Sequence, residues 1–189
     1  MSRFLSKASE SLLPYTPGEQ PQGRKFIKLN TNECPYPPSP KVAEAILAGY
    51  EENSSKIMPL ELANLRLYSD PEERVLIEAI ADHYGVGTNQ VIAGNGSDEI
   101  LGFAFRAFCD QNAPLQFADL TYGFYPALCG LYGIPFKVVP LEEDFTLNIE
   151  PYKNCGNNVI IANPNAPTGM NLPLSAMEEV AASNPDRVV

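Results

Sequence analysis

The sequence contains no tryptophan, one histidine and only four cysteines among its 189 residues. The cysteines are scattered, with no Cys-x-x-Cys pair and no second set of ligands at metal-binding spacing: they are Cys34, Cys109, Cys129 and Cys155. This pattern argues against a zinc site and against a disulfide framework. Reduced thiols are typical of the cytosol, so we expect a cytoplasmic protein.

Basic residues are also scarce. The chain has 13 Lys and Arg but 23 Asp and Glu, which gives a net charge of −10. Nucleic acids and anionic membranes select basic faces, so neither is an expected partner. No hydrophobic run approaches the length of a membrane-spanning helix, and the N-terminal segment lacks the apolar stretch of a secretion signal. Apolar residues still make up 44% of the chain, which suffices for a packed core.

Apolar strands and amphipathic helices alternate from about residue 90 onward. We expect strands at 90–94, 115–119, 135–141 and 158–163, helices at 97–108, 122–133 and 174–183, and the start of another strand at 187–189. This order predicts an α/β fold whose mainly parallel sheet is covered on both faces. Further upstream we expect helices at 39–53 and 70–86, the second with His83 as a half-buried packing residue.

A glycine-rich turn joins the first of these strands to its helix, which opens with Ser97 and Asp98. Backbone N–H groups at the start of such a helix bind phosphate groups. The dinucleotide fingerprint requires a third glycine where this chain has Glu99, so a small phosphate fits better than a dinucleotide. On this stretch alone, a tight turn without a ligand stays open as the alternative.

Two other loops follow expected strands, at the sheet edge where α/β proteins bind ligands. In the first loop, Tyr122 suits stacking on an aromatic ring, whereas for Tyr125 we expect packing on the surface or in the core. The second loop, NPNAPTG at 163–169, carries asparagine side chains that can bind a ligand oxygen or stabilise the turn itself.

Together these segments resemble the fold-type I pyridoxal-phosphate aminotransferases, and within them the histidinol-phosphate branch. The resemblance rests on KLNTNECPYPPSP, LYSDPE, GNGSDEILGFAFRAF, TYGFYP and NPNAPTG, which occur in the family's order. It implies the large domain of that fold, a three-layer α/β/α arrangement, in truncated form. Residues 1–38 would form the N-terminal arm and the start of the small domain, and residues 39–189 the first part of the large domain.

The resemblance also implies a role for particular residues. The turn at Gly96, Ser97 and Asp98 would hold the phosphate of pyridoxal 5'-phosphate, and Tyr122 would stack on its ring. In a homodimer, Tyr68 would reach the cofactor phosphate bound by the partner subunit. The substrate pocket would be lined by Tyr15, Asn32 and Glu33.

One position departs from the family pattern. The family usually has an asparagine directly before Pro-Thr-Gly, where it bonds the phenolic oxygen of the cofactor, but this chain has Ala166. The neighbouring Asn165 replaces that contact only if its side chain turns inward. Stabilising the turn is the alternative role for Asn165.

The implied reaction is transamination between glutamate and imidazole-acetol phosphate, which gives histidinol phosphate in histidine biosynthesis. In the family pattern, the lysine that bonds the cofactor and the acid at its pyridine nitrogen come after the position of Val189. We therefore expect no catalytic residue within this chain and no activity of the chain alone. An aromatic aminotransferase, a threonine-phosphate decarboxylase or a non-catalytic phosphate-binding α/β module are the alternatives.

Overall fold

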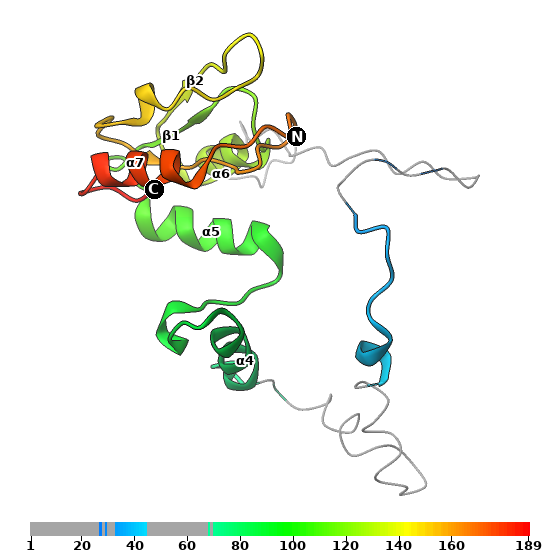
Figure 1. Cartoon of the computed structure of the whole chain (residues 1–189). Coiled ribbons are helices and arrows are strands. Elements are labelled where there is room, and N and C mark those ends of the chain that lie inside the picture. The colour runs from blue at the N-terminus through cyan, green and yellow to red at the C-terminus, as the bar shows by residue number, and fades with distance from the viewer. Residues whose placement is uncertain (1–26, 28, 30–32, 45–67, 69) are drawn as a thin grey trace, which may run out of the picture. The chain divides into compact units, whose positions relative to one another are not determined.

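A computed structural model describes residues 27, 29, 33–44, 68 and 70–189 (Figure 1). The chain divides into two compact units, of which one spans Pro17–Ala93 and the other contains Gly94–Val189. The domain boundary that the resemblance implies after residue 38 stays a prediction.

Helix α4, Arg74–Tyr84, is the longest element described in the Pro17–Ala93 unit. It ends at Gly85, whose φ of 67° lies in the left-handed region that glycine adopts without strain. The expectation that His83 is half-buried was wrong, because this side chain is exposed and its ring meets that of Tyr84 edge-on at 4.9 Å. The remaining helical segments described in this unit are residues 40–44 and the 3-10 helix η1, Thr88–Gln90.

The Gly94–Val189 unit is built on a three-stranded parallel sheet in the order β2-β1-β3. Central strand β1, Leu115–Ala118, pairs along its full length with β2, Phe136–Val139. Its other edge pairs with the short strand β3, Asn158–Val159. All four residues of β1 are buried, as expected for a strand covered on both faces. The predicted parallel sheet is thus confirmed.

Three helices and one helical turn accompany this sheet. They are α5 (Gly96–Phe108), α6 (Phe124–Tyr132), the 3-10 helix η2 (Glu150–Tyr152) and α7 (Leu174–Ser183). The bounds of α7 match the prediction, and α6 begins two residues later than predicted because the first residues after β1 form a bend.

Two apolar clusters cover the two faces of the sheet. The first joins buried side chains of β1, α5, α6 and the turn after α6: Phe105, Leu115, Phe117, Tyr125, Leu128, Cys129 and Ile134. The second joins buried side chains of β2, η2, β3 and α7: Val139, Tyr152, Val159 and Val180. Helices α5 and α6 therefore pack on one face and α7 with η2 on the other, which is the expected three-layer α/β/α arrangement.

The strand expected at 90–94 is not formed. Gln90 ends η1, and Val91 has extended backbone angles, but residues 91–94 pair with no strand in the part of the chain that the structure describes. An apolar run favours extended backbone, but a strand also requires a neighbouring strand to pair with, which the apolar pattern does not reveal.

The C-terminal residues 187–189 lie beside β3 without forming an assigned strand. The backbone N–H of Val159 donates to the carbonyl of Val188 at 2.9 Å. In return, the backbone N–H of Val188 donates to Oδ1 of Asn158 at 3.1 Å. Only the first of these two bonds joins two backbones, as in a strand pair, so the strand predicted to begin at 187–189 is not formed.

Tyr152 is the one side chain with a buried polar atom that finds no hydrogen-bond partner among the described residues. Its exposed fraction is 0%, and burial raises the pKa of its phenol, with a further contribution from the nearby carboxylate of Asp119. A buried hydroxyl without a partner loses its hydrogen bonds to water on folding, which is unfavourable.

We therefore expect Tyr152→Phe to leave the free energy of unfolding unchanged or to raise it by up to about 1 kcal/mol, because the ring stays and the unpaired hydroxyl is removed. Tyr152→Ala, which opens a cavity, should lower that free energy by about 3–5 kcal/mol. Urea unfolding followed by circular dichroism measures both. A loss in Tyr152→Phe comparable to that in Tyr152→Ala would contradict this account.

Candidate functional site

The turn before α5 exposes the positive end of that helix. Gly96 has a φ of 80°, a conformation open to glycine and strained for other residues, and its N–H donates to the carbonyl of Gly94 at 2.9 Å. Ser97 and Asp98 follow as exposed residues of the first helical turn. Backbone N–H groups in a first turn have no intrahelical acceptor, so this turn presents donors to solvent.

Two acidic side chains belong to the same turn, but each has its own hydrogen bond. The Glu99 carboxylate accepts the backbone N–H of Asn95 at 2.6 Å. The Asp98 carboxylate accepts the hydroxyl of Tyr122 at 2.8 Å. These two bonds hold the carboxylates beside the turn and leave the N–H groups of Ser97 and Asp98 available to an anion.

The hydrogen bond to Asp98 also fixes the ring of Tyr122 beside the start of α5, although 24 residues separate the two. The Tyr122 ring packs at right angles to that of Tyr125, with 5.6 Å between centroids, and lies 6.2 Å from the ring of Phe124. Tyr122 is partly exposed, whereas Tyr125 is buried in the first apolar cluster. The structure thus brings together Tyr122 and the turn at Gly96–Asp98, as the site hypothesis requires.

Asn165 lies in the loop after β3 and is buried, with an exposed fraction of 6%. Its amide nitrogen donates to the carbonyl of Leu120 at 2.9 Å and to Oγ1 of Thr168 at 3.1 Å. Its amide oxygen accepts the hydroxyl of Thr121 at 2.8 Å. The side chain therefore binds the segment that leads from β1 to Tyr122, and both of its N–H donors are engaged within the protein.

Asp119 helps to form this edge of the sheet, although the sequence did not predict it as a site residue. Its carboxylate accepts the backbone N–H of Leu120 at 2.8 Å and of Leu141, which follows β2, at 3.0 Å. An acidic residue directly after a strand is a signal for such a turn, but the second partner lies 22 residues away and leaves no trace in the local sequence.

Four further residues are predicted to belong to the site. Tyr68 and Glu33 are exposed residues of the Pro17–Ala93 unit. Tyr15 and Asn32 lie outside the described residues. Their roles in substrate and cofactor binding stay predictions.

A comparison with protein families matches residues 24–188 to the family described as "Aminotransferase class I and II". This match covers most of the chain. The chain belongs to the class I and II aminotransferases.

Several curated relatives carry the same name and are about half identical in sequence to this chain. The "Histidinol-phosphate aminotransferase" of Pseudomonas putida is 48% identical over 189 residues, which are 100% of this chain and 51% of that protein. The "Histidinol-phosphate aminotransferase 1" of Methylococcus capsulatus is 49% identical over 190 residues, 100% of this chain and 50% of that protein. The chain therefore spans about half the length of the curated relatives it matches.

Solved structures support the aminotransferase fold. Histidinol-phosphate aminotransferase from Sinorhizobium meliloti, solved in complex with pyridoxal-5'-phosphate, matches with a TM-score of 0.77 at 24% identity, over 97% of this chain and 48% of that one. A putative histidinol-phosphate aminotransferase from Erwinia carotovora matches with a TM-score of 0.69 at 26% identity, over 85% of this chain and 44% of that one. The expected fold class is thereby confirmed.

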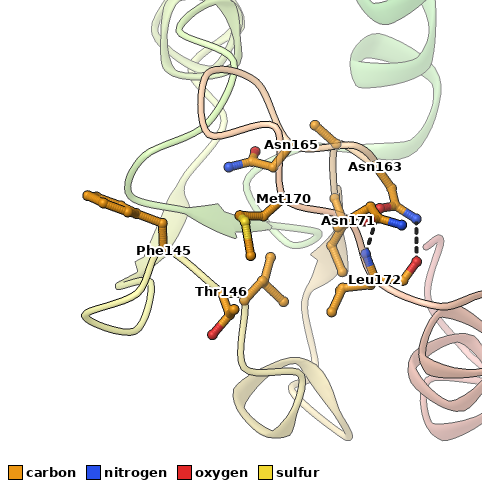
Figure 2. Close-up of a pocket in the computed structure, with 10 residues that line it drawn as sticks. Phe145, Thr146, Asn163, Asn165, Met170, Asn171 and Leu172 are labelled. Carbon is orange, nitrogen blue, oxygen red and sulfur yellow. Dashed lines mark hydrogen bonds between the residues drawn. The ribbon is translucent and has the colours of Figure 1, made fainter.

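A hollow lies beside the loop that carries Asn165, and Figure 2 shows Met170, which follows this loop, near Thr146. Its empty space is about 340 Å³ and opens to solvent. Its lining includes Asn165 but none of Gly96, Ser97, Asp98 or Tyr122. The hollow is therefore distinct from the start of α5.

Two features are absent from the described residues. No group of three or more His, Cys, Asp or Glu side chains is arranged to hold a metal ion. None of the described helices combines the length and the apolar character needed to span a membrane.

The left-handed Gly96 gives a direct test of the turn's geometry. We expect Gly96→Ala to lower the free energy of unfolding by about 1 kcal/mol, because an added Cβ strains the positive φ although open space surrounds it. Gly102→Ala in the middle of α5 is the matched control. Its Cβ would lie 3.4 Å from the Tyr132 hydroxyl, an ordinary contact, so helix propensity should offset any cost. Equal losses in both variants, measured by urea unfolding, would contradict the strained-turn account.

Proposed function

We propose that the turn at Gly96–Asp98 binds the phosphate of pyridoxal 5'-phosphate and that Tyr122 covers the ring of this cofactor. The observation that carries the proposal is the 2.8 Å hydrogen bond between the Tyr122 hydroxyl and Asp98. It holds an aromatic ring next to exposed N–H donors, and pyridoxal phosphate combines an anionic group with a flat aromatic ring. The relative from Sinorhizobium meliloti, whose structure contains this cofactor, supports the choice of ligand.

The residues present fit such a group in charge and in shape. Amide donors at a helix start, together with the Ser97 hydroxyl, suit a phosphate, although the whole chain carries a charge of −10. Glycine at positions 94 and 96 leaves the turn without side chains that would cover the amides. Bound there, pyridoxal phosphate supplies an electron-withdrawing ring that weakens the bonds at the α-carbon of an amino acid.

The whole protein, we propose further, catalyses transamination between glutamate and imidazole-acetol phosphate, giving histidinol phosphate. The shared name of relatives about 48% identical supports this substrate class. We also propose a cytoplasmic homodimer, in which Tyr68 reaches the cofactor phosphate bound by the partner subunit. Tyr15, Asn32 and Glu33 are the proposed substrate-binding residues.

The described lysines nearest in sequence to the site loops do not suit covalent attachment of a cofactor. The Lys153 ammonium lies 2.6 Å from a Glu150 carboxylate oxygen and also pairs with Glu179. The bond to Glu150 and then that to Glu179 raise the pKa of Lys153, whereas a lysine nucleophile needs a lowered pKa. Lys137 is exposed on β2. We therefore propose that these residues take no part in the chemistry.

Titration of the 189-residue chain with pyridoxal phosphate, followed by its absorbance, tests the cofactor site. We expect Ser97→Asp to raise the dissociation constant about tenfold or more, because a carboxylate then competes with the phosphate for the amides. Ser175→Asp is the matched control, since Ser175 is the exposed second residue of α7 as Ser97 is of α5. Tyr122→Ala should weaken binding about tenfold through lost ring contact.

Two further ligands separate the alternatives. Pyridoxal without its phosphate should bind much more weakly than pyridoxal phosphate, and inorganic phosphate should compete only at high concentration. Equal affinity for inorganic phosphate and pyridoxal phosphate would instead indicate a phosphate-binding module. Equal effects of Ser97→Asp and Ser175→Asp would contradict the proposed site.

Borohydride trapping tests the role of the lysines. When the chain is mixed with pyridoxal phosphate and reduced, we expect no stoichiometric lysine adduct by peptide mass spectrometry and no turnover with glutamate as amino donor. Stoichiometric trapping on one lysine together with turnover would overturn the expectation that this chain is inactive alone. Amine release without a keto-acid acceptor would identify a decarboxylase.

A further inference from the structure

The hydrogen-bonding groups of Asn165 are already engaged within the protein. Its side chain makes three hydrogen bonds, to Leu120, Thr121 and Thr168, at 2.8 to 3.1 Å. Its backbone N–H also donates to the carbonyl of Met170, and its carbonyl accepts the N–H of Gly169, both at 2.7 Å. An amide group has two N–H donors, and both are used here.

The partners of the Asn165 side chain lie in two different loops. Thr168 belongs to its own loop, whereas Leu120 and Thr121 lie 45 and 44 residues earlier in the chain, directly before Tyr122. One bond fixes the backbone of this earlier segment through the Leu120 carbonyl, and another fixes it through the Thr121 side chain. Since the amide is buried, these bonds are protected from competing water.

The same segment is held from its other side by Asp119. The Asp119 carboxylate binds the backbone N–H groups of Leu120 and Leu141. Leu120 is thus fixed at both of its backbone polar groups, the N–H by Asp119 and the carbonyl by Asn165. The fixed backbone of Leu120 therefore limits the positions that the next two residues, Thr121 and Tyr122, can take.

We propose that Asn165 is a positioning residue, which holds the Leu120–Thr121 backbone so that the Tyr122 ring stays beside the start of α5. The inference rests on the proposed cofactor site, but it assigns Asn165 a role other than cofactor contact. With Ala166 at the position where the family usually has asparagine, and with the Asn165 donors engaged, no asparagine of this loop bonds the cofactor's phenolic oxygen.

Three variants of the full chain test the positioning role by titration with pyridoxal phosphate. Asn165→Ala should raise the dissociation constant about tenfold, since it removes hydrogen bonds each equivalent to a few-fold change in binding. Thr121→Val, which removes one of them, should raise it about threefold. The double variant should be no weaker than Asn165→Ala alone, because the Thr121 hydroxyl acts through Asn165.

Asn163→Ala is the matched control. Asn163 lies in the same loop and also makes two side-chain hydrogen bonds, with the N–H of Leu172 at 2.9 Å and its carbonyl at 3.1 Å (Figure 2). Neither bond reaches the Leu120–Thr121 segment. We therefore expect this variant to bind pyridoxal phosphate within about twofold of the parent chain. That result would exclude general loosening of the loop as the cause of the weaker binding in Asn165→Ala.

Direct cofactor contact by Asn165 would give a different result. A lost bond to the phenolic oxygen should shift the absorption maximum of bound pyridoxal phosphate in Asn165→Ala and leave Thr121→Val unchanged. Positioning predicts an unchanged maximum at saturation and a response in both variants. A shifted maximum with a neutral Thr121→Val would overturn the proposal.

Hydrogen exchange without any cofactor separates this inference from the proposed function. In Asn165→Ala, mass spectrometry should find faster exchange in peptides covering residues 119–124 and little change in α7, while Asn163→Ala leaves 119–124 unaltered. Unchanged exchange at 119–124 would contradict the positioning role even if pyridoxal phosphate binds. Faster exchange without any binding of pyridoxal phosphate would support the positioning role of Asn165 and contradict the proposed cofactor site.

Discussion

The parallel pairing of β1 with both of its neighbours is the constraint on which the rest of the Gly94–Val189 unit depends. Parallel strands end at one common edge, so the segments after β1 and after β3 meet there although about 40 residues separate them. Tyr122 follows the first of these strands and Asn165 follows the other. The hydrogen bonds of Asn165 to Leu120 and Thr121 are the direct consequence.

Acidic side chains gather at this edge, yet hydrogen bonds hold each of them in place. Asp98 accepts from Tyr122, Glu99 accepts from the N–H of Asn95, and Asp119 accepts from two backbone N–H groups. An acidic protein can thereby offer an anion-binding turn, because local amide dipoles act over a few ångströms while the net charge is spread over the surface.

The sequence predicted what depends on local pattern. The turn at Gly94–Gly96, the parallel sheet and the bounds of α7 all follow from glycine placement and from apolar periodicity. Prediction from the sequence failed where the structure depends on contacts between residues that are distant in the chain. The apolar run at 90–94 forms no strand. The apolar pattern favours extended backbone but does not reveal whether a neighbouring strand is present to pair with it. Likewise, two of the three side-chain partners of Asn165, Leu120 and Thr121, lie more than 40 residues away, so the choice between turn and ligand contact required coordinates.

Two-dimensional NMR of the uniformly ¹⁵N-labelled chain, titrated with pyridoxal phosphate, tests the central claim most directly. The account predicts that the backbone amide signals of Ser97 and Asp98 move most, as their N–H groups bond the phosphate, with smaller shifts at Gly96 and around Tyr122. Shifts confined to the hollow that Met170 lines, or spread evenly over the surface without the Gly96–Asp98 amides, would contradict it.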